Sequence, residues 1–124
     1  MATRATKGME RKSFSSPDER RPFDKGSLEV VNVGGSTIGR GTFQPGFKWS
    51  ECVKPIAKTH SCEARHLGYM VSGRMKIVMD DGSEMEVAPG EAAFIPAGHD
   101  AWVVGKEPCV FIDFSGFAEY AKKA

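Results

Sequence analysis

The chain has 124 residues and a mass of 13.5 kDa, which is room for one domain and excludes architectures of roughly 250 residues such as the eight-fold α/β barrel. Hydrophobic residues make up 40% and charged residues 27%, with 14 Gly and 7 Pro, a balance that suits a packed core with many turns and excludes disorder throughout. The formal net charge of +1 provides no excess for holding a phosphate backbone or an anionic membrane, so we expect neither nucleic acid nor membrane as a partner.

The N-terminal part of the chain differs from the rest in composition. Residues 1–27 carry 7 of the 17 Lys and Arg but only 4 of the 16 Asp and Glu, and they show almost no apolar periodicity. Such a segment buries too little surface to offset its ordering entropy, so we predict a flexible arm over residues 1–22 and a single domain over residues 23–124. The basic start lacks an apolar stretch behind it, and three widely spaced cysteines cannot form a disulfide framework; both features predict a cytoplasmic protein.

From Leu28 onward, short runs of β-forming residues alternate with Gly, Pro and Asp, a pattern typical of an antiparallel sandwich or barrel. Turn signals such as Asp81-Gly82 and Pro89-Gly90 separate several of these runs. Only Phe117–Lys123 looks helical, so the sequence predicts an all-β fold with a short C-terminal helix. The predicted strands are Leu28–Val33, Thr37–Phe43, Lys48–Val53, His66–Ser72, Met75–Asp80, Glu84–Val87, Ala92–Ile95, Ala101–Val104 and Cys109–Phe114.

The first predicted strand suggests self-association. Leu28, Val30 and Val31 would lie on an edge strand, whose backbone donors and acceptors are open to pairing. We therefore expect a homodimer in which residues around Phe23–Val33 pair with the partner's sheet.

Alternation within the predicted strand that begins at His66 assigns its side chains to two faces. His66 and Met70 share one face, whereas Leu67, Tyr69 and Val71 share the other. Apolar residues on both faces are expected where one face lines a barrel and the other packs against a second sheet or a subunit.

All three histidines of the chain, His60, His66 and His99, lie near predicted strand ends, and Cys62 lies between the first two. In an extended segment, the even spacing of positions 60, 62 and 66 places the three side chains on one face. Imidazole and thiolate are ligands for Zn, Fe, Ni or Cu, whereas Mg and Ca prefer oxygen. The residues alone leave two interpretations open: metal ligands, or histidines with structural hydrogen bonds.

The spacing His60-x-Cys62-x3-His66-x6-Gly73, followed by Gly90-x5-Pro96-x-Gly98, resembles the two motifs of the cupin superfamily. In that family the first motif reads Gly, five residues, His-x-His, three or four residues, Glu, six residues, Gly. The second reads Gly, five residues, Pro-x-Gly, two residues, His. The resemblance extends over roughly residues 45–114 and is greatest to small single-domain bacterial cupin proteins of largely unassigned function. It implies an antiparallel β-barrel of the jelly-roll type.

The metal positions of these motifs are altered in this chain. His60 matches the first motif histidine, Cys62 stands in place of the second, and His66 stands in place of the glutamate. Ala101 occupies the histidine position of the second motif, with His99 two residues earlier, on the same face of a regular strand. The resemblance therefore implies a barrel whose ligand set is altered, and it does not carry the family's metal chemistry over to this chain. If a metal binds, we expect His66, Cys62, His99 and His60 at the barrel mouth to hold one divalent transition ion, and we expect no organic cofactor.

Three functions remain open at this point. The first is a metal-containing cupin that takes a small molecule at an open coordination position, where the metal acts as a Lewis acid in an isomerisation, lyase or oxygenase reaction. The second is a metal-free module that binds or senses a small molecule, and the third is a scaffold for a dimer. Met70, Trp49 and Trp102 are candidates for the pocket lining, although large aromatic residues in a small barrel also serve as core or dimer contacts.

Overall fold

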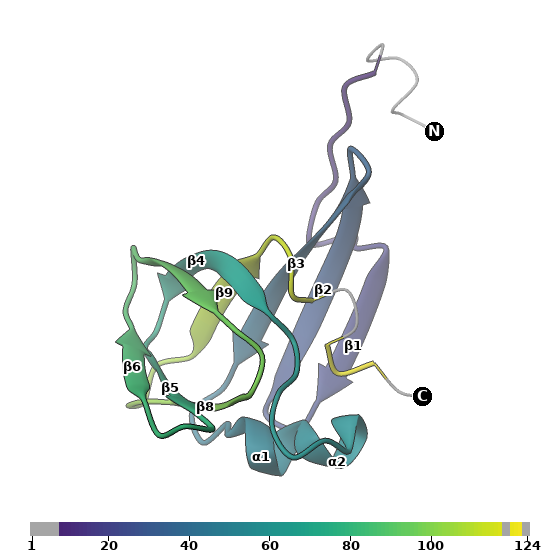
Figure 1. Ribbon diagram of the computed structural model, residues 1–124. Coiled ribbons are helices and arrows are strands. Elements are labelled where there is room, and N and C mark those ends of the chain that lie inside the picture. Colours follow the sequence, from purple (N-terminus) through teal and green to yellow (C-terminus); the bar gives the residue numbers. More distant parts are fainter. Residues whose placement is uncertain (1–7, 118–119, 123–124) are drawn as a thin grey trace.

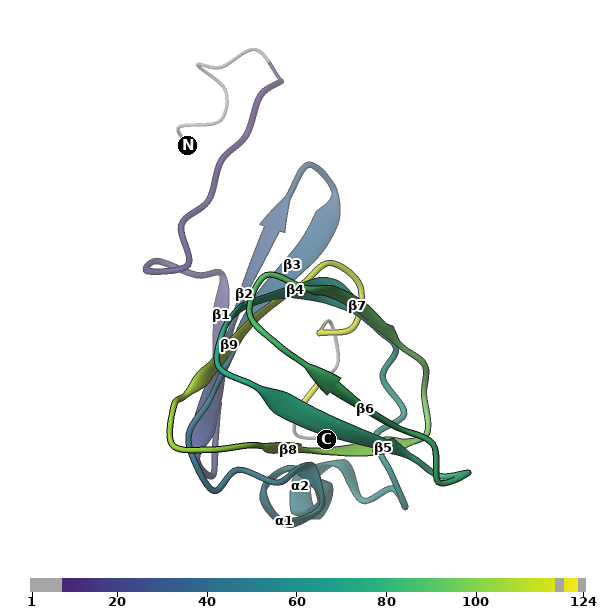
Figure 2. The ribbon, with the colours of Figure 1, turned by 90° about the vertical axis from the view of Figure 1, so that its left-hand side faces the viewer.

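Two antiparallel sheets form the body of the protein in a computed structural model that describes residues 8–117 and 120–122 (Figure 1). Seen end-on, the sheets face each other and enclose the interior (Figure 2). The six-stranded sheet has the order β1 (Glu19–Phe23), β2 (Gly26–Val33), β3 (Ser36–Phe43), β9 (Cys109–Asp113), β4 (His66–Ser72) and β7 (Ala92–Ile95). The three-stranded sheet has the order β6 (Glu84–Val87), β5 (Met75–Met79) and β8 (His99–Val103).

This arrangement confirms the predicted all-β, antiparallel jelly roll. The ends of the strands from β2 to β9 agree with the predicted strands to within two residues. Tight turns join several of them, as at Gly82, whose φ of 91° lies in the left-handed region that glycine enters at low cost.

One predicted strand, Lys48–Val53, is wrong, because residues 49–52 form a helical turn and only Lys48 makes an isolated bridge, to Trp102. The short helices α1 (Trp49–Cys52) and α2 (Lys54–Ala57) lie below β8 in Figure 1. The Asp100 carboxylate accepts a hydrogen bond from the backbone N–H of Ser50 at 3.0 Å, and thereby satisfies a donor in the first turn of α1. This contact comes from a distant part of the chain, which local strand propensity cannot anticipate. Neither helix is long and apolar enough to cross a membrane, and the same holds for every helix in the described part of the chain.

The predicted C-terminal helix is absent from the described residues of that segment, which are Phe117 and residues 120–122. Tyr120 and Ala121 lie in a turn, and the φ of 56° at Ala121 is incompatible with a continuing right-handed helix. The carbonyls of Phe117 and Tyr120 accept hydrogen bonds from the Arg21 guanidinium at 3.0 and 2.8 Å. The remainder of the predicted helix, residues 118, 119 and 123, lies outside the described residues.

Strand β1 lies mostly within the segment expected to be an arm. Residues 19–22 pair with β2, and Pro22 suits this edge position because an edge strand tolerates the loss of one N–H donor. Because β2 lies between β1 and β3, Leu28, Val30 and Val31 are buried within the chain. The edge-strand argument for a homodimer is therefore wrong. Of the expected arm, residues 1–7 lie outside the described part.

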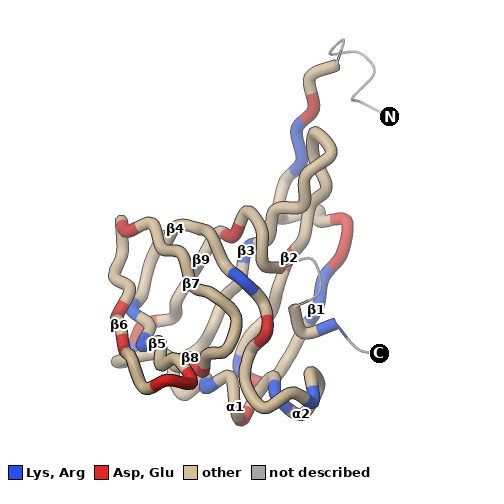
Figure 3. Tube along the Cα trace, viewed as in Figure 1, with Lys and Arg blue, Asp and Glu red and all other residues tan. Residues whose placement is uncertain are grey.

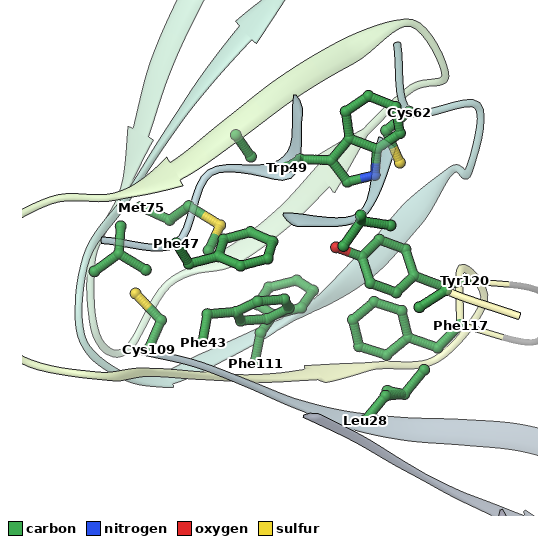
Figure 4. Packing of buried hydrophobic residues seen from close by; sticks show 14 of the residues in the cluster. Leu28, Phe43, Phe47, Trp49, Cys62, Met75, Cys109, Phe111, Phe117 and Tyr120 are labelled. Carbon is green, nitrogen blue, oxygen red and sulfur yellow. The ribbon is translucent and has the colours of Figure 1, made fainter. Parts of the chain in front are cut away.

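The interior between the sheets is filled largely by aromatic rings (Figure 4). Phe43 and Phe47 pack with ring centroids 4.8 Å apart. Phe117 lies against Gly39 of β3, where a Cβ would come within 2.5 Å of its ring. Figures 1 and 2 together place the segment after β9, which carries Phe117 and Tyr120, at one open end of this interior.

Candidate metal centre

Cys62 and His99 are brought together by backbone pairing. The N–H of Cys62 donates to the carbonyl of His99 at 2.8 Å, and the N–H of Gly98 donates to the carbonyl of Cys62 at 2.7 Å. Residues that lie opposite one another in an antiparallel pair have neighbouring side chains. The φ of 92° at Gly98 allows the turn that starts β8, so His99 enters the strand with its side chain buried in the interior.

His66 approaches from the opposite sheet as the first residue of β4. Its ring lies 5.3 Å from the His99 ring, measured between centroids. Its Nδ1 is 2.5 Å from Oδ2 of Asp113, a carboxylate with 0% of its surface exposed. The other oxygen of Asp113 accepts hydrogen bonds from the backbone N–H groups of Ser115 and Gly116 at 2.9 and 2.8 Å. This arrangement fixes the orientation of the His66 ring.

The hydrogen bonds define which nitrogen of each histidine is free to act as a ligand. Burial raises the pKa of Asp113, but hydrogen bonds from His66 and from two backbone amides outweigh this effect and lower the pKa below its ordinary value. The ionised carboxylate can only accept, so Nδ1 of His66 carries a proton, and Nε2 is the nitrogen whose lone pair the neutral ring would offer to a metal. Nδ1 of His99 likewise donates to the carbonyl of Pro96 at 2.8 Å, which leaves its Nε2 free.

The protonation states of the other donors also have physical causes. Burial lowers the pKa of His99, which keeps this imidazole neutral as a metal ligand requires. Burial raises the pKa of the Cys62 thiol to about 12, and the charges of Glu63, Asp113 and Asp100 act in the same direction. Without a cation Cys62 is therefore a thiol, and a divalent metal would displace its proton and balance the thiolate charge.

The spacing of the three donors fits a transition metal after a small adjustment. Cys62 Sγ and His66 Nε2 are 3.8 Å apart, and one donor atom from each of Cys62, His66 and His99 lies within 4.8 Å of the others. Tetrahedral Zn, with bonds of about 2.3 Å to sulfur and 2.0–2.1 Å to nitrogen, holds its donors roughly 3.4–3.6 Å apart. A contraction of roughly 1 Å would therefore complete the site.

The remaining predicted site residues occupy different places. His60 is exposed and lies outside the cluster of three donors. The parity argument assumed a regular strand, but residues 59–61 form a bend and only an isolated bridge follows at Cys62. Trp49 and Met70 line the interior cavity. Trp102 faces the other side of β8, where it lies half-buried beneath the Lys48 ammonium at 5.1 Å from its ring centroid.

Two residues of the site were not predicted from the sequence. Asp113 shares the inward parity of Cys109 and Phe111 on β9, and a carboxylate on the core face of an apolar strand is a signal that could have identified it. Tyr120 packs its ring 5.8 Å from that of His66, and burial raises the pKa of its phenol well above the ordinary value. No sequence signal links Tyr120 to the histidines, because the turn that carries it depends on tertiary contacts.

Comparison with known proteins agrees with this architecture. The family model described as "Cupin domain" matches residues 40–115. A search of curated proteins found no match. Many solved structures are similar to this chain, and three of them serve as examples. A sugar phosphate isomerase from Silicibacter pomeroyi is 20% identical, and the match covers 86% of this chain and 75% of that chain with a TM-score of 0.60. The polyketide cyclase RemF from Streptomyces resistomycificus is 24% identical, and the match covers 87% of this chain and 79% of that chain with a TM-score of 0.59. The oxalate decarboxylase of Lactobacillus farciminis is 18% identical, and the match covers 82% of this chain and 32% of that chain with a TM-score of 0.58.

The TM-scores show a common fold, whereas identities below 25% carry no activity over to this chain. This chain also spans only about a third of the oxalate decarboxylase. The family match covers more than half of the chain and includes all three donors, together with Asp113. The cluster of one cysteine and two histidines contains three of the four site residues expected from the sequence and differs from the His-x-His, Glu and His positions of the two cupin motifs. The chain therefore belongs to the cupin domain family, and within its fold it carries a buried Cys–His–His group that could hold a metal ion.

Proposed function

We propose that this protein is a mononuclear metal-binding cupin in which Cys62 Sγ, His66 Nε2 and His99 Nε2 hold one divalent transition ion, Zn, Fe, Ni or Cu. The observation that carries this proposal is the convergence of three buried donors whose other hydrogen-bonding atoms are already satisfied. Metal-binding histidines typically donate their second N–H to a carboxylate or a backbone carbonyl. His66 donates to the carboxylate of Asp113, and His99 donates to the backbone carbonyl of Pro96.

Three protein ligands leave a coordination position for a small exogenous ligand. Bound there, the ion would supply Lewis-acid chemistry, while Asp113 holds His66 in the tautomer that can bind. The metal-free alternative, a module that binds a small molecule through hydrogen bonds from the histidines, has less support. The cavity beside them has a volume of about 40 Å³, and the Nδ1 atoms of both rings are already engaged.

We further propose a homodimer, through a different surface from the one expected from the sequence. Exposed apolar side chains gather on the outer face of β4 and β7, where Leu67 lies opposite Phe94 in the strand register and both are about half exposed. Tyr69 and Val71 extend this outer face along β4. Both strands lack Lys, Arg, Asp and Glu along their length (Figure 3). The Arg65 guanidinium, which precedes β4, lies over the Phe94 ring at 5.3 Å, so two copies that pack here would bring it to the edge of the interface.

The test is the metal content of protein purified without a metal-affinity tag, measured by elemental analysis. We expect one equivalent of a transition metal per chain in the wild type. Cys62→Ser should weaken metal binding by about a hundredfold or more, because it removes a ligand. Cys52→Ser and Cys109→Ser are matched controls, since both thiols are buried but lie outside the donor cluster. Equal metal content in all three variants would contradict the proposal.

A further inference from the structure

The space beside the candidate metal centre is occupied by the protein itself. Inward-facing glycines on β3 and β4 leave room that aromatic rings take up. At Gly41 an added Cβ would lie 2.7 Å from the Phe43 ring, and at Gly68 it would lie 2.6 Å from the Phe111 ring. The interior is therefore built to be filled by side chains.

The cavity that remains has a volume of about 40 Å³, which holds roughly two or three water molecules. Pockets that receive organic molecules commonly measure about 300–1,000 Å³. Both His66 and His99 line the cavity, so it adjoins the position that a metal would take. Apart from these two residues and the polar atoms of Trp49 and Tyr120, the lining identified among the described residues is aromatic or aliphatic and carries no charge.

One open end of the interior is closed by the segment after β9. The rings of Phe117 and Tyr120 lie 5.4 and 5.8 Å from that of His66, between centroids. Figure 4 shows the two rings packed together, with the Tyr120 hydroxyl pointing inward beneath Trp49. Hydrogen bonds from Arg21 to the carbonyls of Phe117 and Tyr120 hold these two residues in place, and Glu19 pairs with the same guanidinium at 2.7 Å.

A larger groove of about 230 Å³ adjoins Cys62. Its lining includes Cys62, Trp49 and Tyr120 but neither histidine. Trp49 and Tyr120 line both spaces and so separate the groove from the cavity at the histidines. A molecule in the groove would have to pass these two side chains to reach the cavity at the histidines.

We infer that the metal centre accepts, in addition to its protein ligands, only an exogenous ligand of up to about three non-hydrogen atoms, and that it excludes ring-sized organic molecules. The ligand class is therefore water or hydroxide, a neutral diatomic molecule, or a triatomic anion whose charge the metal balances. An anion has only the metal as its charge partner here, since the lining is uncharged. This inference rests on the proposed metal binding.

The experiment uses the full chain loaded with Co²⁺, whose visible absorption changes when a ligand is added to its coordination shell. Azide, with three atoms in a line, and imidazole, a five-membered ring, are titrated separately into the same sample. We expect azide to bind and to saturate, and imidazole to bind about tenfold or more weakly, because extra volume in a packed interior is costly.

Phe117→Ala enlarges the cavity and should bring imidazole binding to within about threefold of azide binding. Phe114→Ala is the matched control, because Phe114 is exposed and lies outside the cavity lining, and it should behave as the wild type. If Phe117→Ala does not fold, Ile95→Ala provides a smaller truncation of the same lining.

The outcomes separate the two proposals. Failure of the wild type to take up Co²⁺ would overturn the metal-binding function and this inference with it. Uptake of Co²⁺ followed by equal binding of azide and imidazole would overturn only the size limit, and so would a cavity-enlarging variant that gains no affinity for imidazole. Uptake of Co²⁺ with no response to azide would also overturn the inference, because the centre would then accept no exogenous ligand.

Discussion

Asp113→Asn is the substitution that most directly tests how the His66 ring is held. The asparagine oxygen can still accept the backbone hydrogen bonds from Ser115 and Gly116, so the change falls on the single contact with His66 at 2.5 Å. An amide N–H facing Nδ1 would donate to it, and the proton of the imidazole would move to Nε2. His66 would then present an N–H where a metal needs a lone pair.

The expected loss of metal affinity follows from the removal of this carboxylate, which orients the His66 ring. Substituting such a partner of a metal-binding histidine typically lowers metal affinity by about 10–100-fold, which corresponds to roughly 1.4–2.7 kcal/mol. Because Asp113 is fully buried and its bond to His66 is charge-assisted, we also expect the free energy of unfolding of the metal-free protein to fall by about 1.5–3 kcal/mol.

Metal affinity is measured by competition with a chromophoric chelator, and stability by urea unfolding with and without metal. Glu29→Gln is the matched control, because Glu29 is another buried carboxylate, held by Arg20 and Arg40 at 3.1 Å each, on β2 and away from the donors. It should lose stability but keep the wild-type metal affinity. The tautomer argument would be refuted if the metal affinity of Asp113→Asn stayed within about twofold of the wild type. It would also be refuted if Glu29→Gln lost as much metal affinity as Asp113→Asn.

Three further predictions concern pH, packing and assembly. The folded-state pKa of His99 is depressed by burial, so the unfolded chain binds more protons below about pH 6.5. Stability of the metal-free protein should therefore fall as the pH is lowered from that value towards the folded-state pKa, by at most about 1.4 kcal/mol per pH unit, and His99→Gln should lack this dependence in urea unfolding at stepped pH. Gly68→Ala should destabilise the protein by about 1–3 kcal/mol in thermal unfolding, because the methyl group meets a carbonyl and a ring of β9. The double variant Leu67→Lys and Val71→Lys should sediment as a monomer, whereas Met85→Lys, on the other sheet, should keep the wild-type mass; a monomeric wild type would contradict the proposed interface.

The strands were predictable because each is bounded by a local signal. Alternation on β4 placed His66 and Met70 inward, and their burial agrees with that assignment. Where the signal was not local, the prediction failed. Residues 48–53 contain β-formers, yet their helical turn depends on Asp100, which lies some fifty positions away in the sequence.

The donor set was only partly predictable for the same reason. Even spacing places His60 and Cys62 on one face only if the segment is a strand, and the bend at residues 59–61 breaks that condition. His99 faces inward because β8 begins at it, so its two-residue offset from Ala101 preserves the face. The role of Asp113 depends on the pairing of β4 with β9, which a single sequence does not specify.

The two histidines come from opposite sheets, His66 from the six-stranded sheet and His99 from the three-stranded one. A metal bound by both would therefore act as a cross-link between the two layers, in a chain whose three cysteines are all free and form no covalent bridge. Separation of the sheets would require the metal to be released first. The main consequence is kinetic: the loaded protein should have a much longer unfolding half-life than the metal-free form, and a chelator should shorten it.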